Sequence, residues 1–177
     1  RRLARGKDKL ERAENHFMEV LNYSLSHSQT YTDLAEIEKI RAKYLAKDSM
    51  EKILFLNRAK EHYLKNRDLS PESREVYLEL GNIAMLIGNV QESILYYTTS
   101  FSLLKQDSSL LAKQKKYTVF SEWANSIVSE KKIASTGTDR FFTIESQEPV
   151  DEEFKTLLAI AREGYLEALK YSSDDYD

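Results

Sequence analysis

The chain has 177 residues, a formal net charge of −3 and no cysteine. Its length suffices for one domain to bury a core without metals or disulfides, and the missing thiols exclude disulfide frameworks, thiolate metal sites and cysteine nucleophiles. A near-neutral charge is unlike the clearly basic surface of most nucleic-acid-binding domains. No apolar run reaches the roughly 18 residues that a membrane-spanning helix needs. We therefore expect a cytoplasmic or nuclear protein, and the opening at Arg1 favours a fragment of a longer chain.

Apolar residues recur at helical spacing along most of the chain, which predicts an all-α fold. Glycine and proline are rare, at five and two residues, whereas good helix formers are abundant. No segment alternates apolar and polar residues with period two, so no sheet is expected. Seven helices are predicted, over residues 3–26, 31–47, 50–66, 71–87, 89–105, 109–132 and from 151 to near the end.

Several predicted boundaries rest on specific capping residues. Asp48 with Glu51, and Asn89 with Glu92, have the spacing of a capping box and mark helix starts. Ser70-Pro71 resembles an N-cap followed by proline at the first helical position. Gly88 is suited to the left-handed conformation that closes many helices.

Residues 74–107 carry a set of positions at fixed spacing: Tyr77, Leu80-Gly81, Gly88, Ser93, Tyr97 and Ser100. Small residues in such a set allow two helices to approach closely, and the aromatic residue fills the space beside them. This segment resembles one tetratricopeptide repeat, a helix pair of about 34 residues. It departs from that pattern at Ala84, at the two serines that replace alanines, and at Lys105.

Half-signatures of the same repeat occur elsewhere in the chain. The segments that resemble a first helix contain Tyr31 with Leu34-Ala35, and Phe120 with Trp123-Ala124; those that resemble a second helix contain Ala13 with Phe17, Ala59 with Tyr63, and Ala161 with Tyr165. The second repeat is stretched by about twelve residues, and the third contains an inserted loop at 133–150. The resemblance implies one domain over 1–177, built as antiparallel helix pairs stacked in a right-handed superhelical solenoid.

No arrangement of residues indicates catalysis or a bound metal or cofactor. The residues three before His16, His27 and His62 are not glutamates, which excludes the Glu-x-x-His pattern of di-metal bundles. Carboxylates alternate with lysine and arginine, as on solvated helix faces. We expect no catalytic residues, no metal site and no cofactor.

The resemblance also implies a site. In this family the first helix of each pair lines a concave groove that binds a peptide. The groove positions carried over to this chain are Glu75, Leu78, Asn82, Met85 and Leu86, then Thr118, Ser121, Asn125, Val128 and Ser129. Asn82 and Asn125 occupy the same position of the repeat, where an amide can both donate to and accept from a peptide backbone. Alternatively, both asparagines bond to water on a helix surface.

The subtype that clamps a terminal carboxylate places lysine and arginine at two positions that hold glutamates here, Glu75 and Glu79. Two carboxylates repel a third, so the sequence argues against that subtype. The favoured function is a non-enzymatic adaptor or scaffold that binds a partner protein or peptide. The alternative is an RNA-binding or RNA–protein assembly factor that uses the basic residues of 1–12 and the cluster at Lys113, Lys115 and Lys116.

The predicted loop at 133–150 contains Phe141, Phe142 and Ile144. Leaving two phenylalanines in water forgoes about 1.5–3 kcal/mol each relative to burial. We expect this loop either to cap the end of the solenoid or to lie in the concave groove as a competitor of the partner.

Overall fold

The computed structural model describes residues 2–106, 121, 124–125, 127 and 152–172. Within these residues the regular structure is entirely helical, which confirms the predicted all-α class. The helices are α1 (Arg2–Tyr23), α2 (Ser28–Tyr44), α3 (Ser49–Leu69), α4 (Arg74–Ile87), α5 (Val90–Gln106) and α7 (Glu152–Ser172).

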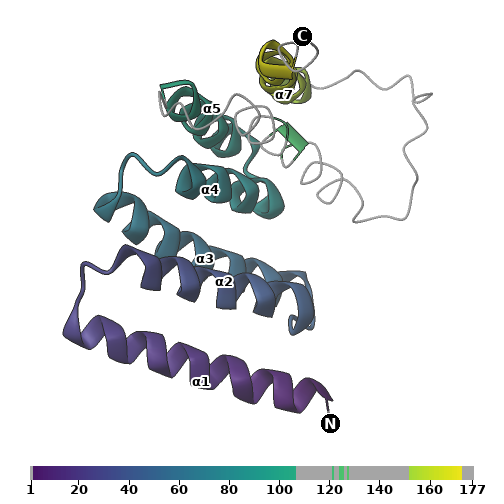
Figure 1. Cartoon of the computed structure of the whole chain (residues 1–177). Helices are drawn as coiled ribbons and strands as arrows, with labels where there is room; N and C mark the ends of the chain where they lie inside the picture. Colours follow the sequence, from purple (N-terminus) through teal and green to yellow (C-terminus); the bar gives the residue numbers. More distant parts are fainter. Residues whose placement is uncertain (1, 107–120, 122–123, 126, 128–151, 173–177) are drawn as a thin grey trace.

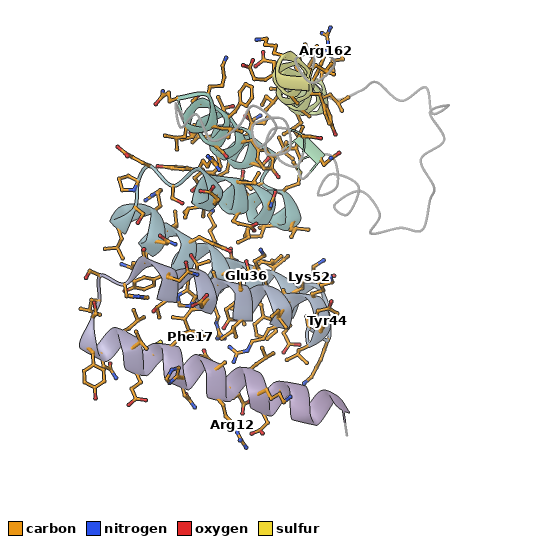
Figure 2. The ribbon with its side chains drawn as sticks, in the orientation of Figure 1. Arg12, Phe17, Glu36, Tyr44, Lys52 and Arg162 are labelled. Atoms are coloured by element: carbon orange, nitrogen blue, oxygen red, sulfur yellow. The ribbon has the colours of Figure 1, made fainter. Side chains whose placement is uncertain are left out.

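The helices lie one above another in chain order, from α1 at one end to α7 at the other (Figure 1). The most extensive contacts join α2 to α3 and α4 to α5, and α3 also packs on α4. Smaller contacts join α1 to α2 and α5 to α7. On α1, Phe17 lies on the side toward α2, whereas Arg12 lies on the opposite side (Figure 2).

The core consists of two buried clusters that meet at α4 and α5. One cluster joins α2, α3, α4 and α5 around Leu56, Tyr63 and Leu80. The other joins α4 and α5 to α7 and to the helical residues Ala124 and Ile127. Because each cluster is formed by neighbouring helices, burial continues from α2 to α7, and neither cluster includes α1.

The helix ends confirm three predicted caps. Asp48 Oδ1 accepts from the Glu51 backbone N–H at 2.8 Å, and Asn89 Oδ1 accepts from that of Glu92 at 3.2 Å. Glu51 Oε2 in turn accepts from the backbone N–H of Lys47, at 2.7 Å. Gly88 closes α4 with φ 92°, in the left-handed region.

Two predicted helix starts are wrong. The helix predicted from Tyr31 begins at Ser28, because the buried Thr30 bonds its hydroxyl to His27 Nδ1 at 2.7 Å and extends the helix backwards. The helix predicted from Pro71 begins at Arg74.

The reason for the second error lies in how α3 ends. The backbone N–H of Ser70 still bonds to Asn66 O, so Ser70 ends α3 and does not cap α4. The N–H of Ser73 then bonds to Ser70 O at 3.1 Å, which places Pro71 second in a turn. The fixed φ of proline suits that position as well as the first residue of a helix.

The helices α4 and α5 pack tightly against each other at Gly81. A Cβ built on Gly81 would lie 2.5 Å from two ring carbons of Tyr97, closer than real Cβ atoms come to a neighbour. Any residue larger than glycine at this position therefore requires Tyr97 to move. The prediction that Gly81 lies where paired helices meet is confirmed.

Most of the small residues predicted at the helix contacts are also buried, whereas Ala13 of α1 is only half-buried. The buried ones are Ala35, Ala124, Ala59, Ser93, Ala161, Ser100 and Ala168, each at most 2% exposed. Most of the predicted helix 109–132, including Trp123, and the whole loop 133–150 with Phe141, Phe142 and Ile144 lie outside the described residues.

Candidate functional site

The same hydrogen bond occurs in three successive helix pairs. Tyr63 donates its hydroxyl to Glu36 Oε1 at 2.5 Å, Tyr97 donates to Asn82 Oδ1 at 3.0 Å, and Tyr165 donates to Asn125 Oδ1 at 2.7 Å. In each case the tyrosine lies four residues after a small buried residue and the acceptor directly follows one. One side-chain contact therefore recurs at residues with the same sequence spacing.

This hydrogen bond determines where two of the predicted groove residues lie. Asn82 is buried, with Oδ1 bonded to Tyr97, and Met85 is only 1% exposed within the core. In this structure neither side chain is presented to a partner, because both fill the contact between α4 and α5. Asn125 also accepts from a tyrosine, but its side chain is exposed.

The remaining predicted groove residues are more accessible or lie outside the described residues. Glu75 is exposed and pairs with Arg74, with Oε1 and Nε 2.9 Å apart, while Leu78 is half-buried beside the second core cluster. Ser121 is half-buried in a helix. Thr118, Val128 and Ser129 are outside the described residues.

A cavity of about 440 Å³, here called the polar cavity, opens between the N-terminal halves of α2 and α4. Tyr63 and Asn66 of α3 line it together with groups from the turn before α4. The side chains that α2 and α4 contribute are Ser28, Gln29, Thr32, Glu36, Glu75, Val76 and Glu79. Most of these are polar, so the cavity offers hydrogen-bonding groups from both α2 and α4.

A charged cluster closes one side of the polar cavity. Lys39 of α2 bonds Glu36 at 2.7 Å and Glu79 of α4 at 2.6 Å, so it joins the two helices. Burial lowers the pKa of Lys39, but the two carboxylates outweigh burial and hold that pKa above its usual value. Burial, together with Glu79 and Glu36, raises the pKa of Tyr63. Lys39 therefore stays charged and Tyr63 stays a neutral donor.

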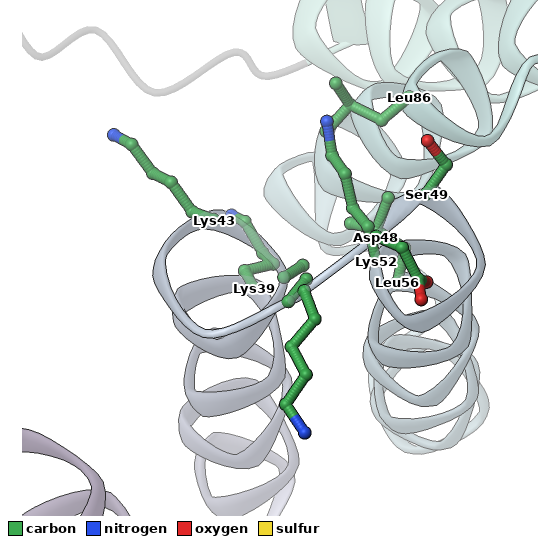
Figure 3. A pocket seen from close by; sticks show the side chains of 10 residues that line it. Lys39, Lys43, Asp48, Ser49, Lys52, Leu56 and Leu86 are labelled. Atoms are coloured by element: carbon green, nitrogen blue, oxygen red, sulfur yellow. The ribbon is translucent and has the colours of Figure 1, made fainter. Parts of the chain in front are cut away.

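A second cavity, about 610 Å³ and here called the lysine cavity, lies at the other end of α2 (Figure 3). Its apolar wall is formed by Ala42 of α2, Ala46 in the turn that follows, Leu56 of α3 and Leu86 of α4. Four lysines also line it: Lys39, Lys43, Lys47 and Lys52. Lys39 thus separates the two cavities, since the carboxylates that it binds line the polar one.

Sequence reasoning missed the contribution of α2 to these cavities. Gln29, Thr32, Glu36 and Lys39 lie at the same sequence distances from Leu34-Ala35 as the predicted groove residues of α4 do from Leu80-Gly81. The signal was present in Tyr31 and Leu34-Ala35, from which these positions could have been counted. What the sequence lacked was the true start of α2, three residues earlier than predicted.

A separate polar cluster joins α1 to α2 and α3. Arg41 bonds both Glu14 of α1 and Glu38 of α2, each at 2.5 Å. The hydrogen bond from Arg41 lowers the pKa of Glu14, although burial opposes it. Burial lowers the pKa of the neighbouring His62 against the field of three glutamates. This cluster orients α1 and lines neither cavity.

The described residues contain no group of three or more histidine, aspartate or glutamate side chains placed to hold a metal ion. None of the helices in the described part of the chain combines the length and the hydropathy needed to cross a lipid bilayer. The predicted basic cluster at Lys113, Lys115 and Lys116 lies outside the described residues, and Arg12 is paired with Asp8 at 3.0 Å.

The two cavities therefore form a candidate binding surface along α2 and α4, with polar and acidic groups at one end and apolar and basic groups at the other. Comparison of the chain with models of protein families and with curated proteins finds no match to either.

Proposed function

We propose that this chain is a non-enzymatic interaction module that binds an extended segment of a partner protein along α2 and α4. The observation that carries the proposal is the polar cavity, to which the N-terminal halves of α2 and α4 both contribute mostly polar side chains. Extended peptides need donors and acceptors for their backbone at regular intervals, and the side chains of Gln29 and Thr32 supply such groups. The buried Asn66 donates its amide to Thr32 Oγ1 at 2.5 Å and so holds that hydroxyl in place. The role of an adaptor or scaffold within a larger assembly follows from this mode of binding.

The proposal includes the architecture that the tetratricopeptide resemblance implies, a right-handed superhelical solenoid. Three features support it: the order of the helices, the close contact at Gly81, and the recurrent tyrosine bond in three helix pairs. In such a solenoid the first helices face one side together, so a surface that begins on α2 continues onto α4.

A peptide-display selection tests the proposed function. Peptides of about twelve random residues are selected for binding to the purified chain. Their affinity is then measured for the Gln29→Trp variant, in which the tryptophan side chain is expected to fill the mouth of the polar cavity. Gln29 is exposed, with its amide bonded to Asp33 at 3.1 Å, so this substitution leaves the core unchanged. We expect the selected peptides to bind the variant at least about tenfold more weakly.

The matched control is Asn57→Trp, which places the same side chain on an exposed position of α3 that lines neither cavity. We expect this control to bind like the unmodified chain. If selection enriches no peptide, or if both tryptophan variants bind equally well, the proposed function is wrong.

A further inference from the structure

The lysine cavity arises from a difference in helix length between the two helix pairs. The helices α2 and α3 have 17 and 21 residues, whereas α4 has 14. Residues 42, 43, 46–49 and 52, at and beside the turn between α2 and α3, line the cavity together with Leu86 near the end of α4. The stretch of about twelve residues noted in the sequence therefore builds a cavity beyond the end of the shorter helix.

Three of the four lysines that line this cavity can meet a ligand with their charge, although the Lys43 ammonium also lies 5.0 Å from the centroid of the Tyr44 ring. Lys39 is held by Glu36 and Glu79, but no ion pair within the described residues engages Lys43, Lys47 or Lys52. Asp48 is the one acidic residue of the described lining, and its Oδ1 already accepts from the Glu51 backbone N–H. The rim consequently carries an excess of positive charge.

The floor of the cavity is aliphatic. Leu56 and Ala42 are buried, and Leu86 and Ala46 are half-buried. Such a floor gains free energy when it covers an apolar side chain. A ligand that matches both features has an apolar group between negative charges.

We infer that the lysine cavity binds an acidic partner segment in which a large apolar side chain is flanked by aspartate or glutamate. The apolar side chain rests on Leu56 and Leu86, and the carboxylates meet Lys43, Lys47 and Lys52. This inference rests on the proposed function and names the partner chemistry at one end of the same surface. A segment that continues past Lys39 reaches the polar cavity.

The lining favours a peptide over a single-stranded nucleic acid. Bound bases are usually stacked on aromatic side chains, and the described lining of the lysine cavity contains none. A phosphate backbone alone also has no apolar group that could pack against the aliphatic floor. Charge complementarity together with an apolar floor therefore selects an acidic, partly apolar polypeptide.

The same display selection tests this inference. We expect the enriched peptides to contain more aspartate and glutamate than the starting library, together with a leucine-sized or aromatic residue. One selected peptide, synthesised with a fluorescent label, is then measured on the triple variant Lys43→Glu, Lys47→Glu, Lys52→Glu. We expect its affinity to fall by about tenfold or more, because attraction becomes repulsion at three sites.

Two controls separate charge at the cavity from charge in general. The variant Lys7→Glu, Lys9→Glu, Lys65→Glu changes the net charge equally at exposed positions away from the cavity, and we expect it to bind within about twofold of the unmodified chain. Replacing the apolar residue of the peptide by serine, with its acids kept, should weaken binding by about tenfold. Thermal melting of each variant verifies that the fold is intact.

The outcomes distinguish this inference from the proposed function. Suppose that Gln29→Trp weakens binding of the selected peptides, but these peptides lack acidic residues or bind the lysine-cavity triple variant as tightly as the unmodified chain. The proposed function then stands, and the lysine-cavity inference is overturned. Equal losses in the two triple variants indicate general attraction and also overturn it. A labelled RNA oligonucleotide or an anionic vesicle that binds more tightly than the peptide, and loses binding only in the cavity variant, overturns the choice of partner.

Discussion

The hydroxyl of Tyr97 on α5 donates a hydrogen bond to Oδ1 of Asn82 on α4, 3.0 Å away inside the contact of the two helices. The same relation joins Tyr63 to Glu36 and Tyr165 to Asn125. The bonds of Tyr97 and Tyr63 satisfy hydroxyl groups that the helix contacts remove from water, and a buried group left without a partner is costly, whereas the bond of Tyr165 is exposed. Recurrence of the bond makes the register of the helix pairs testable.

Removal of the Tyr97 hydroxyl tests this bond. Tyr97→Phe should lower the free energy of unfolding by about 1–2 kcal/mol, because Asn82 then has a buried oxygen with one partner fewer. Tyr165→Phe should cost less than about 0.5 kcal/mol, since water replaces the hydroxyl at the exposed Asn125. Urea denaturation followed by circular dichroism measures both. Equal losses would contradict the burial difference.

The contact at Gly81 predicts that even one methyl group is too large there. Gly81→Ala should lower the free energy of unfolding by about 1–3 kcal/mol, because its Cβ meets the Tyr97 ring at 2.5 Å. Gly6→Ala is the matched control, since Gly6 lies in α1 and has nothing within 4 Å of its Cβ position. We expect the control to keep or raise the melting temperature, because alanine is the better helix former.

Substitutions at Gly88 test backbone strain without a change in packing. A Cβ at Gly88 meets nothing within 4 Å, but φ is 92°. Gly88→Ala should therefore destabilise by about 1 kcal/mol through the left-handed backbone alone. Gly88→Asn should cost less, since asparagine tolerates this conformation better than alanine does. If alanine and asparagine gave the same melting temperature as glycine, α4 would end differently.

The ion pair between Glu14 and Arg41 predicts a pH dependence of stability. Arg41 lowers the pKa of Glu14 below the ordinary 4.5, so the carboxylate stabilises the fold above that pH. As the pH falls through the lowered pKa, the carboxylate is protonated and the contribution disappears. Glu14→Gln should lower the free energy of unfolding by about 0.5–1 kcal/mol at neutral pH, with partial exposure limiting the effect.

Chemical denaturation of both proteins across acidic pH measures this difference. We expect the curves for the unmodified chain and Glu14→Gln to converge as the pH drops below 4.5. A difference that persists unchanged in acid would show that Glu14 acts through packing and not through its charge.

The sequence by itself determined the helical class and the chemistry of several helix ends. Helical spacing of apolar residues, the caps at Asp48 and Asn89, and the glycine at position 88 act between residues close in the chain, so they can be read locally. Gly81 was also predictable, because its spacing from Tyr97 is set by one short hairpin. These features require no knowledge of distant neighbours.

Only the tertiary structure decided which polar residues face solvent. Asn82 matched a groove position, yet the Tyr97 hydroxyl takes its oxygen and the neighbouring helix covers it. Lys39 looked like an ordinary surface lysine, yet it joins α2 to α4 through Glu36 and Glu79. The lysine cavity depends on the unequal lengths of α2, α3 and α4, which became clear only when their ends were placed beside one another. Burial and cavity shape depend on contacts between segments far apart in the chain, and such contacts leave no local pattern in the sequence.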